Sequence, residues 1–327
     1  MRAVILSTSH KLVDVEVPDP EPGAHDLLVR IEAVSVNPVD VKSRGGSHDG
    51  EPRILGYDAA GVVEAVGPKV TRFRPGDEVY YAGNVRRQGS NAELQVVDER
   101  IVGHKPAGLD MAQAAALPLT TITAWESLFE HLGLTAESTG TLLVVGAAGG
   151  VGSMVTQLAR SRTELTIIGT ASRADSQRWA REMGADEVVD HHQGLARQVL
   201  KSHPDGVEYV FSPHSASNVG EYARVLKPFG HVVAIDEVDD IQPLKAKSIA
   251  WHWELMFTRP TYAPDDDSQG RLLDEVARMV DAGDIRSTLT TRLGPLDAAT
   301  LTEAHRLVGT GSGVGKVVVQ KEPAGPR

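Results

Sequence analysis

Apolar and polar positions change their spacing along the chain, and this change separates two kinds of region. Residues 1 to 118 contain short apolar or alternating runs separated by Pro and Gly, among them RAVIL (2–6), LLVRIEAVSV (27–36) and AELQVV (92–97). We therefore expect a β-rich, partly barrel-like unit here. From Asp110 the residues favour helix, and Pro118 is expected to break that run.

A second region, from Thr141 onward, alternates strand-like with helix-like segments. Strands are predicted at 141–145, 165–172, 187–191, 207–212, 231–236 and 254–259, and helices at 153–161, 176–183, 216–226 and 270–282. This alternation predicts an α/β fold with a doubly wound parallel sheet. Residues 288–320 return to strand, helix and strand, and we expect them to pack on the N-terminal unit.

A glycine-rich turn joins the strand at 141–145 to the following helix. Its sequence AAGGVG (147–152) matches the dinucleotide fingerprint G-x-G-x-x-G with alanine at the first glycine position. The turn brings a helix N-terminus, with free N–H groups and a positive dipole end, to a pyrophosphate. A purely structural turn is the alternative. The residues predicted to bind a cofactor here are Gly146, Ala147, Ala148, Gly149, Gly150, Val151 and Gly152.

The end of the second predicted strand indicates which nicotinamide cofactor is bound. An NAD site places a carboxylate there to hold the ribose 2′-hydroxyl. This chain instead has Ser172 and Arg173, which can bind a 2′-phosphate, so the sequence favours NADPH over NADH. Asp175 is evidence against this choice, although we expect it to cap the helix that begins near Ser176.

Composition excludes several classes of function. The chain of 327 residues has a net charge of −11 and no Lys/Arg block, which argues against nucleic acid and anionic membranes as partners. It has no long apolar run and no signal-peptide pattern, so we expect a cytoplasmic protein. The absence of cysteine excludes disulfides, thiolate catalysis and cysteine-containing zinc sites.

Several motifs in order along the chain resemble those of the medium-chain dehydrogenase/reductase superfamily. Within it the chain resembles the zinc-free quinone oxidoreductase branch, and in particular proteins called zinc-type alcohol dehydrogenase-like. Besides the glycine turn, the motifs are Asn37-Pro38-Val39-Asp40, GYDAAGVV (56–63), PGDEV (75–79), AAALP (114–118), Thr123-Ala124-Trp125 and WHWELMFTR (251–259).

The resemblance implies a discontinuous GroES-like catalytic domain, residues 1–118 with 288–327, and a Rossmann NAD(P)-binding domain, residues 119–287. It implies a cofactor in the cleft between them and a homodimer in which the strand near Leu255 to Arg259 extends the sheet across the two-fold axis. An ordinary edge strand is the alternative. Further cofactor contacts implied by the resemblance are His191, Ser212, Ala234, Phe257 and Lys316.

The chain departs from the superfamily at the catalytic zinc. The positions that match two of the zinc ligands are Asn37 and Tyr57, and the third falls near Leu119 or Thr120. None of these is a good zinc ligand, because zinc prefers thiolate, imidazole or carboxylate. The adjacent His191 and His192 would point in opposite directions on a strand. We therefore expect no metal.

Without a metal, the chemistry is restricted to reactions whose product anion is delocalised. Asn37 and Tyr57 are the candidates for hydrogen bonds to the substrate oxygen, and filling of the vacated metal pocket is the alternative for both. Thr123, with Thr121, is expected to line the nicotinamide pocket, with helix capping as the alternative.

The sequence thus predicts an NADPH-dependent, metal-free oxidoreductase that transfers hydride to a small quinone or α,β-unsaturated carbonyl. Two alternatives remain open at this point. One is an alcohol dehydrogenase or aldehyde reductase. The other is an NADPH-binding sensor or crystallin-like protein with little catalysis.

Overall fold

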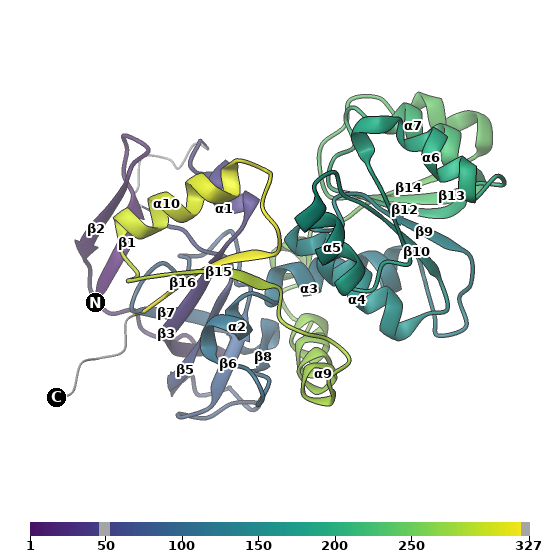
Figure 1. The fold of residues 1–327 in the computed structure, drawn as a ribbon. Helices are drawn as coiled ribbons and strands as arrows, with labels where there is room; N and C mark the ends of the chain where they lie inside the picture. The colour runs from purple at the N-terminus through teal and green to yellow at the C-terminus, as the bar shows by residue number, and fades with distance from the viewer. Residues whose placement is uncertain (46–52, 322–327) are drawn as a thin grey trace. The chain divides into compact units, whose positions relative to one another are not determined.

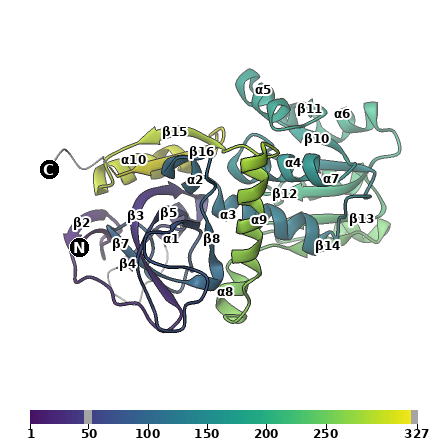
Figure 2. The same cartoon turned by 90° about the horizontal axis from the view of Figure 1, so that it is seen from below.

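The computed structural model describes residues 1–45 and 53–321, which form two compact units. The first unit contains Met1–Ile122 together with the chain from Phe257 onward, and the second contains Thr123–Met256. The strands of the two units form separate sheets (Figures 1 and 2). Each unit also has its own hydrophobic core.

The first unit is built around a long strand, β3 (Asp26–Val36), which pairs antiparallel with three other strands. Its seven-stranded sheet has the order β15-β16-β3-β5-β6-β8 with β7 also paired to β3, and a small sheet has the order β2-β1-β4. The other strands are β1 (Arg2–Leu6), β2 (Leu12–Glu16), β4 (Arg53–Ile54), β5 (Ala59–Val66), β6 (Glu78–Tyr81), β7 (Leu94–Asp98), β8 (Val102–His104), β15 (Leu289–Leu293) and β16 (Lys316–Gln320).

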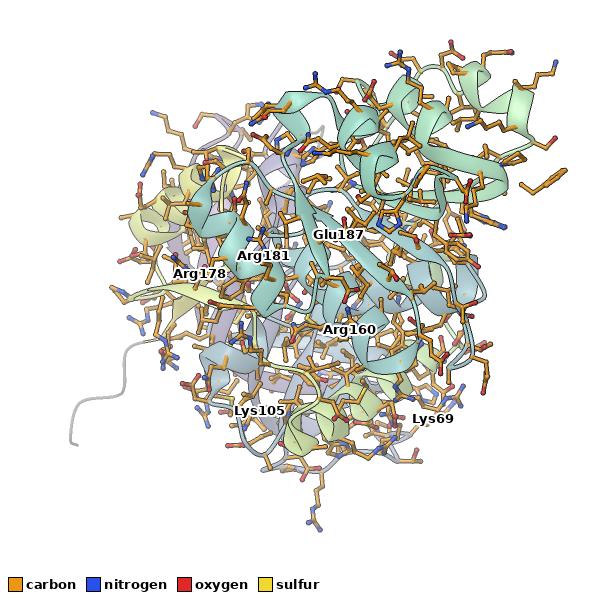
Figure 3. The ribbon with its side chains drawn as sticks, turned by 45° about the vertical axis from the view of Figure 1, so that its right-hand side comes forward. Lys69, Lys105, Arg160, Arg178, Arg181 and Glu187 are labelled. Atoms are coloured by element: carbon orange, nitrogen blue, oxygen red, sulfur yellow. The ribbon has the colours of Figure 1, made fainter. Side chains whose placement is uncertain are left out.

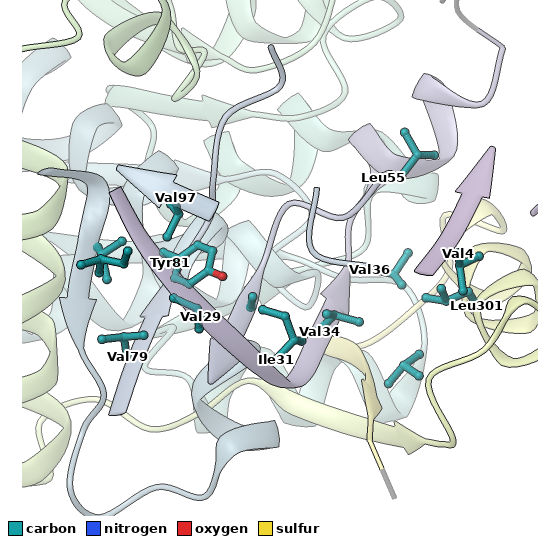
Figure 4. Packing of buried hydrophobic residues seen from close by; sticks show 14 of the residues in the cluster. Val4, Val29, Ile31, Val34, Val36, Leu55, Val79, Tyr81, Val97 and Leu301 are labelled. Atoms are coloured by element: carbon teal, nitrogen blue, oxygen red, sulfur yellow. The ribbon is translucent and has the colours of Figure 1, made fainter. Parts of the chain in front are cut away.

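Alternation along these strands places one apolar face in the core of the first unit. Val29, Ile31 and Val34 of β3 lie beside Val79 and Tyr81 of β6 in this cluster (Figure 4). The helical elements of this unit are α1 (Pro38–Ser43), η1 (Glu99–Ile101), α2 (Met111–Ala115), α8 (Thr258–Tyr262), α9 (Ser268–Ala282) and α10 (Ala298–Gly309); α3 (Pro118–Trp125) begins here and continues into the second unit.

The C-terminal segment packs against the N-terminal strands. β16 lies antiparallel to β3, with Val317 opposite Val36, and Leu301 of α10 joins the same core as Val4 of β1. The strand, helix and strand expected at 288–320 are therefore present. Residues 257–287 also belong to this unit, whereas we had expected them in the dinucleotide-binding domain; α9 packs on β8 and η1 instead.

The second unit is a six-stranded, fully parallel sheet in the order β11-β10-β9-β12-β13-β14. Chain order reverses between β9 and β12, the point at which open α/β sheets bind ligands beyond their carboxyl ends. The doubly wound fold predicted from the sequence is confirmed. The strands are β9 (Thr141–Val144), β10 (Thr166–Thr170), β11 (Glu187–Val189), β12 (Val207–Ser212), β13 (Leu226–Ala234) and β14 (Ala250–Trp253).

Helices cover both faces of this sheet, with α6 and α7 on one side and α4 on the other (Figure 1). The helix α6 is not among the helices predicted from the sequence, although Leu195 and Val199 have helical spacing and are buried. The helical elements are η2 (Glu126–His131, a π-helix), α4 (Gly150–Arg162), α5 (Ala174–Glu182), η3 (His191–Gln193), α6 (Leu195–Ser202), α7 (Val219–Val225) and η4 (Gln242–Lys247).

The sixth strand lies earlier than predicted. We expected it at 254–259, but β14 ends at Trp253 and residues 258–262 form α8. Pro260 has no N–H and cannot donate to a sheet, which limits a strand there. The expectation that Leu255 to Arg259 would extend the sheet is therefore wrong, and β14 is the edge strand.

Candidate functional site

The glycine turn after β9 has the geometry of a phosphate-binding turn. Gly146 has φ +67°, and its N–H donates to Oγ1 of Thr170 at 2.9 Å. A Cβ on Gly152 would lie 2.2 Å from the carbonyl oxygen of Gly146, so no larger residue fits without a shift of the backbone. The turn is thus closed against the start of α4, where the fingerprint requires its third glycine.

Alanine at the first position of the fingerprint is accommodated by β10. Ala147 is fully buried, and a Cβ on Gly169 would lie 2.8 Å from the Cβ of Ala147. Gly169 therefore provides the space that the missing glycine would have left.

The N-terminus of α4 is open to a ligand. Its N-cap is Gly149, which has no side chain to occupy the first-turn N–H groups, and Gly149, Gly150 and Val151 are only half-buried. The 13-residue helix α4 presents the positive end of its dipole here, beside a glycine backbone that carries no side chain. These features fit the pyrophosphate of a dinucleotide.

Ser172 and Arg173 follow β10, as predicted. Ser172 is half-buried, and the exposed Arg173 is the N-cap of α5, where it lies 3.4 Å from Asp175. The expectation that Asp175 caps this helix is wrong, because α5 begins at Ala174 and Asp175 lies in its first turn. Arg178 and Arg181 are exposed on the same helix (Figure 3).

His191 follows β11 at one edge of the parallel sheet, whereas Ser212 and Ala234 end the neighbouring strands β12 and β13. His191 is exposed in η3, with its ring centroid 4.2 Å from that of His192, so the expectation that the two point in opposite directions is wrong. Partial desolvation of the ring and the neighbouring His192 lower the pKa of His191.

The hydroxyl of Ser212 is held in an internal network. Its Oγ lies 2.7 Å from the hydroxyl of Tyr222 and 3.0 Å from Oγ of Ser215, which in turn donates to Asp236 at 2.7 Å. Ala234 is buried beside Ser212 in the register of β12 and β13. These two residues therefore shape the carboxyl edge of the sheet.

In the first unit, Lys316 lies beside Asn37. The ammonium of Lys316 donates to Oδ1 of Asn37, to Oδ2 of Asp58 at 3.1 Å and to the carbonyl of Val36 at 3.3 Å. Lys316 and Asp58 are both buried, so this ion pair is shielded from water. No pattern in the sequence connects residues 37 and 316.

The amide of Asn37 is used entirely within this network. Its Nδ2 donates to Oδ2 of Asp58 at 2.8 Å and contacts the carbonyls of Tyr57 and Ser35 at 3.3 and 3.4 Å. Both amide hydrogens are occupied, so Asn37 has none left for a substrate oxygen in this arrangement. Asn37 thus holds its neighbours in this arrangement, and its role toward a substrate oxygen stays a prediction.

Two carboxyl groups complete the cluster. Burial raises the pKa of Asp58, and Lys316 and Asn37 oppose that shift. Burial also raises the pKa of Asp40 to about 7, although Oδ2 of Asp40 accepts the N–H of Asn37 at 2.7 Å. Oδ1 of Asp58 accepts the N–H of Leu119 at 2.7 Å, which connects the cluster to the start of α3.

Tyr57 and Phe257 pack edge to face, with ring centroids 5.5 Å apart. Both belong to the first unit and both are buried, so Phe257 lies beside the candidate Tyr57. Burial raises the pKa of Tyr57, which keeps its hydroxyl protonated. Thr123 is buried on α3, and Oγ1 of Thr121 on the same helix has no hydrogen-bond partner among residues 1–45 and 53–321.

The described residues contain no cluster of candidate metal ligands and no candidate membrane-spanning helix. No group of three or more His, Asp or Glu side chains within 1–45 and 53–321 could hold a metal ion. No helix in the same part of the chain is long and apolar enough to cross a membrane.

Comparisons with known proteins match both units. An alcohol dehydrogenase GroES-like domain matches residues 23–124, and a zinc-binding dehydrogenase domain matches residues 183–319. A zinc-type alcohol dehydrogenase-like protein of Staphylococcus epidermidis is 39% identical over 92% of both chains. A quinone oxidoreductase of Pseudomonas aeruginosa is 33% identical over 89% of this chain and 91% of its own.

Solved structures of related proteins are similar to this chain over nearly its whole length. A protein of Rhizobium etli described as a putative zinc-dependent alcohol dehydrogenase is 48% identical, covers 99% of both chains and has a TM-score of 0.94. A mycobacterial protein solved with NADPH is 27% identical over 98% of this chain and 99% of its own, with a TM-score of 0.85. The chain therefore belongs to the medium-chain dehydrogenase/reductase superfamily, as its motifs had predicted.

Proposed function

We propose that this protein is an NADPH-dependent reductase of quinones or α,β-unsaturated carbonyls that works without a metal. The observation that carries the proposal is the ammonium of Lys316 bound to Asn37, the position that matches a zinc ligand. Reduction of a simple aldehyde creates a localised alkoxide, which needs a strong electrophile. Reduction of a quinone or enone creates a delocalised anion, which hydrogen bonds can stabilise.

NADPH is the proposed cofactor and supplies the hydride when bound. The N-terminus of α4 and the backbone of Gly149 to Gly152 would hold its pyrophosphate, because the N-cap Gly149 has no side chain to occupy the first N–H groups of the helix. Ser172 and Arg173 would hold the 2′-phosphate, and no carboxylate follows β10 until Asp175. The relative solved with NADPH supports this choice.

Residues of the first unit would act on the substrate oxygen. The hydroxyl of Tyr57 stays protonated at neutral pH, so it can donate a hydrogen bond and pass on a proton. Asn37 would position the site, because its Nδ2 donates to Asp58 and its Oδ1 accepts from the ammonium of Lys316. Thr123 is proposed to contact the nicotinamide end of the cofactor.

We also propose that the protein forms a homodimer through β14. This strand is the sheet edge, and Trp253 and the following Leu255 are 52% and 62% exposed. An unpaired edge with exposed apolar side chains favours pairing with a second strand. Light scattering coupled to gel filtration should give a dimer for the native chain and a monomer for W253K; equal masses for both would contradict this interface.

The function is tested by measuring oxidation of NADPH and NADH with quinones, enones and aldehydes, with and without a chelator. We expect chelator-insensitive turnover of quinones or enones and a preference for NADPH. R173A should lose most of that preference through a higher KM for NADPH, whereas R178A, on the exposed face of α5, should retain it. Turnover of aldehydes alone would favour the alcohol dehydrogenase alternative, and tight NADPH binding without turnover would favour a sensor.

A further inference from the structure

The buried cluster around Asn37 contains a cation that belongs to the protein itself. We infer that the ammonium of Lys316 is a built-in cation that holds Asn37 and Asp58 in place and excludes a divalent metal from this site. The inference rests on the proposed function for its effect on turnover, but its structural part is independent of the substrate.

The ammonium has a complete set of acceptors. An ammonium group carries three hydrogens, and Lys316 has three oxygen partners, from Val36, Asn37 and Asp58. These residues lie at the end of β3, at the start of α1 and in the segment before β5. Lys316 lies on β16, the strand that pairs with β3. The side chain of Lys316 is 4% exposed and that of Asp58 is fully buried, so neither charge is solvated on its own.

Zinc does not fit this arrangement, although the matched domain is described as zinc-binding. The donors around the ammonium are a carbonyl, an amide and one carboxylate, and only the carboxylate is among the thiolate, imidazole and carboxylate ligands that zinc prefers. A divalent ion at this position would also have to displace an ammonium that has no other partner in the cluster. An unpaired buried charge is strongly unfavourable, so the lysine competes directly with the metal.

The position of the cation also explains how the site is ordered. Lys316 binds Oδ1 of Asn37 and thereby fixes the orientation of that amide, so Nδ2 faces Asp58. The other carboxylate oxygen of Asp58 then receives the N–H of Leu119. Lys316 is therefore a positioning residue, which acts through Asn37, Asp58 and the start of α3.

The inference is tested by removing the ammonium and returning it from solution. K316A lacks the last three carbons and the nitrogen of the side chain, which n-propylammonium can replace. We expect K316A to lose about tenfold or more in kcat. Saturating n-propylammonium should restore most of it, following the protonated fraction of the amine, whereas the neutral n-propanol of similar shape should restore none. Full activity of K316A without amine, or equal rescue by propanol, would overturn the inference.

K105A is the matched control. Lys105, labelled in Figure 3, also has a buried side chain in the first unit. Its ammonium donates to two backbone carbonyls and pairs with Glu78. K105A should lose stability but keep its kcat per folded molecule. If K316A does not fold, K316M keeps the apolar stem of the side chain and takes its place. A loss of kcat in K105A as large as that in the Lys316 variant would overturn the assigned positioning role.

Metal exclusion is tested on the native chain. After incubation with Zn²⁺ or Co²⁺ and desalting, we expect well below one equivalent of metal by mass spectrometry. One tightly held equivalent that is lost in N37A would overturn the inference. If the native protein turns over no acceptor, the proposed function fails; the inference is then decided by metal content and by whether n-propylammonium raises the Tm of K316A and propanol does not.

Discussion

Ala147 and Gly169 occupy one shared space between the glycine turn and β10. A Cβ on Gly169 would lie only 2.8 Å from the Cβ of Ala147, closer than two carbon atoms can approach without a shift. The fingerprint alanine is therefore paired with a glycine on the next strand. The two positions should behave as a unit when either is changed.

We expect G169A to destabilise the protein by about 1–3 kcal/mol, because overpacking a tight contact forces the turn or the strand to move. The double variant A147G/G169A should recover most of this loss, since only one methyl group then occupies the space. Urea unfolding of the native chain, both single variants and the double variant gives the coupling energy. Additive effects would show that the two residues do not share this contact.

The two glycines at the start of α4 should separate cofactor binding from stability. A Cβ on Gly149 would lie 3.4 Å from the carbonyl oxygen of Gly146, but on Gly152 it would lie at 2.2 Å. G149A should therefore fold normally and lose NADPH affinity, because the methyl group intrudes where the pyrophosphate approaches. G152A should lose stability. Thermal unfolding without cofactor and NADPH titration by fluorescence separate the two effects. Unchanged NADPH affinity in G149A would contradict the proposed pyrophosphate site at the start of α4.

Much of the fold could be predicted from local patterns. The mainly apolar run at 141–145 forms a strand that is buried on both faces of the parallel sheet, and such a run is recognisable from the sequence. The edge strand β14 was misplaced because its residues are only half-buried or exposed. The apolar Met256 and Phe257, which suggested a strand, are instead buried beyond its end.

The candidate site was predictable only where it is continuous in sequence. The glycine turn can be recognised from neighbouring residues, and Gly169 could not, because its contact with Ala147 depends on strand pairing. From the sequence, Asn37 is a candidate for the substrate oxygen and Lys316 a separate candidate for the cofactor. Their contact spans 279 positions and depends on β16 lying beside β3, which no local pattern encodes.

Glu254 should make the protein less stable as pH rises. Burial raises the pKa of Glu254 from 4.5 to about 7, and its Oε2 lies 2.8 Å from Nε2 of His131. Between these pH values the folded protein keeps a proton that the unfolded chain releases, so the free energy of unfolding falls as pH rises through the window. E254Q should be more stable than the native chain by up to about 3 kcal/mol at pH 8, with little difference at pH 4.

Urea unfolding at both pH values checks this prediction for Glu254. E164Q is the control, because Glu164 is exposed in the same unit and its removal should leave the pH dependence unchanged. A stability difference between E254Q and the native chain that is the same at pH 4 and pH 8 would show that this carboxyl does not titrate in the window.

His305 should act in the opposite pH direction. It is buried on α10, and neither ring nitrogen has a hydrogen-bond partner in the described part of the chain. Burial, assisted by the charge of Arg44, lowers the pKa of His305 from 6.5 to about 4. The unfolded chain therefore takes up a proton between these pH values that the folded protein does not, and the free energy of unfolding falls as pH falls through this window.

H305L should remove this dependence, because leucine fills the space without a titratable group. The difference in free energy of unfolding between H305L and the native chain should shift by about 3 kcal/mol in favour of the variant from pH 7.5 to pH 4. This shift is expected whatever the difference in stability at pH 7.5. H192L, at an exposed histidine, should follow the native pH profile. Chemical unfolding across the pH range measures all three proteins, and parallel profiles for H305L and the native chain would mean that His305 is protonated in the folded protein as readily as in the unfolded chain.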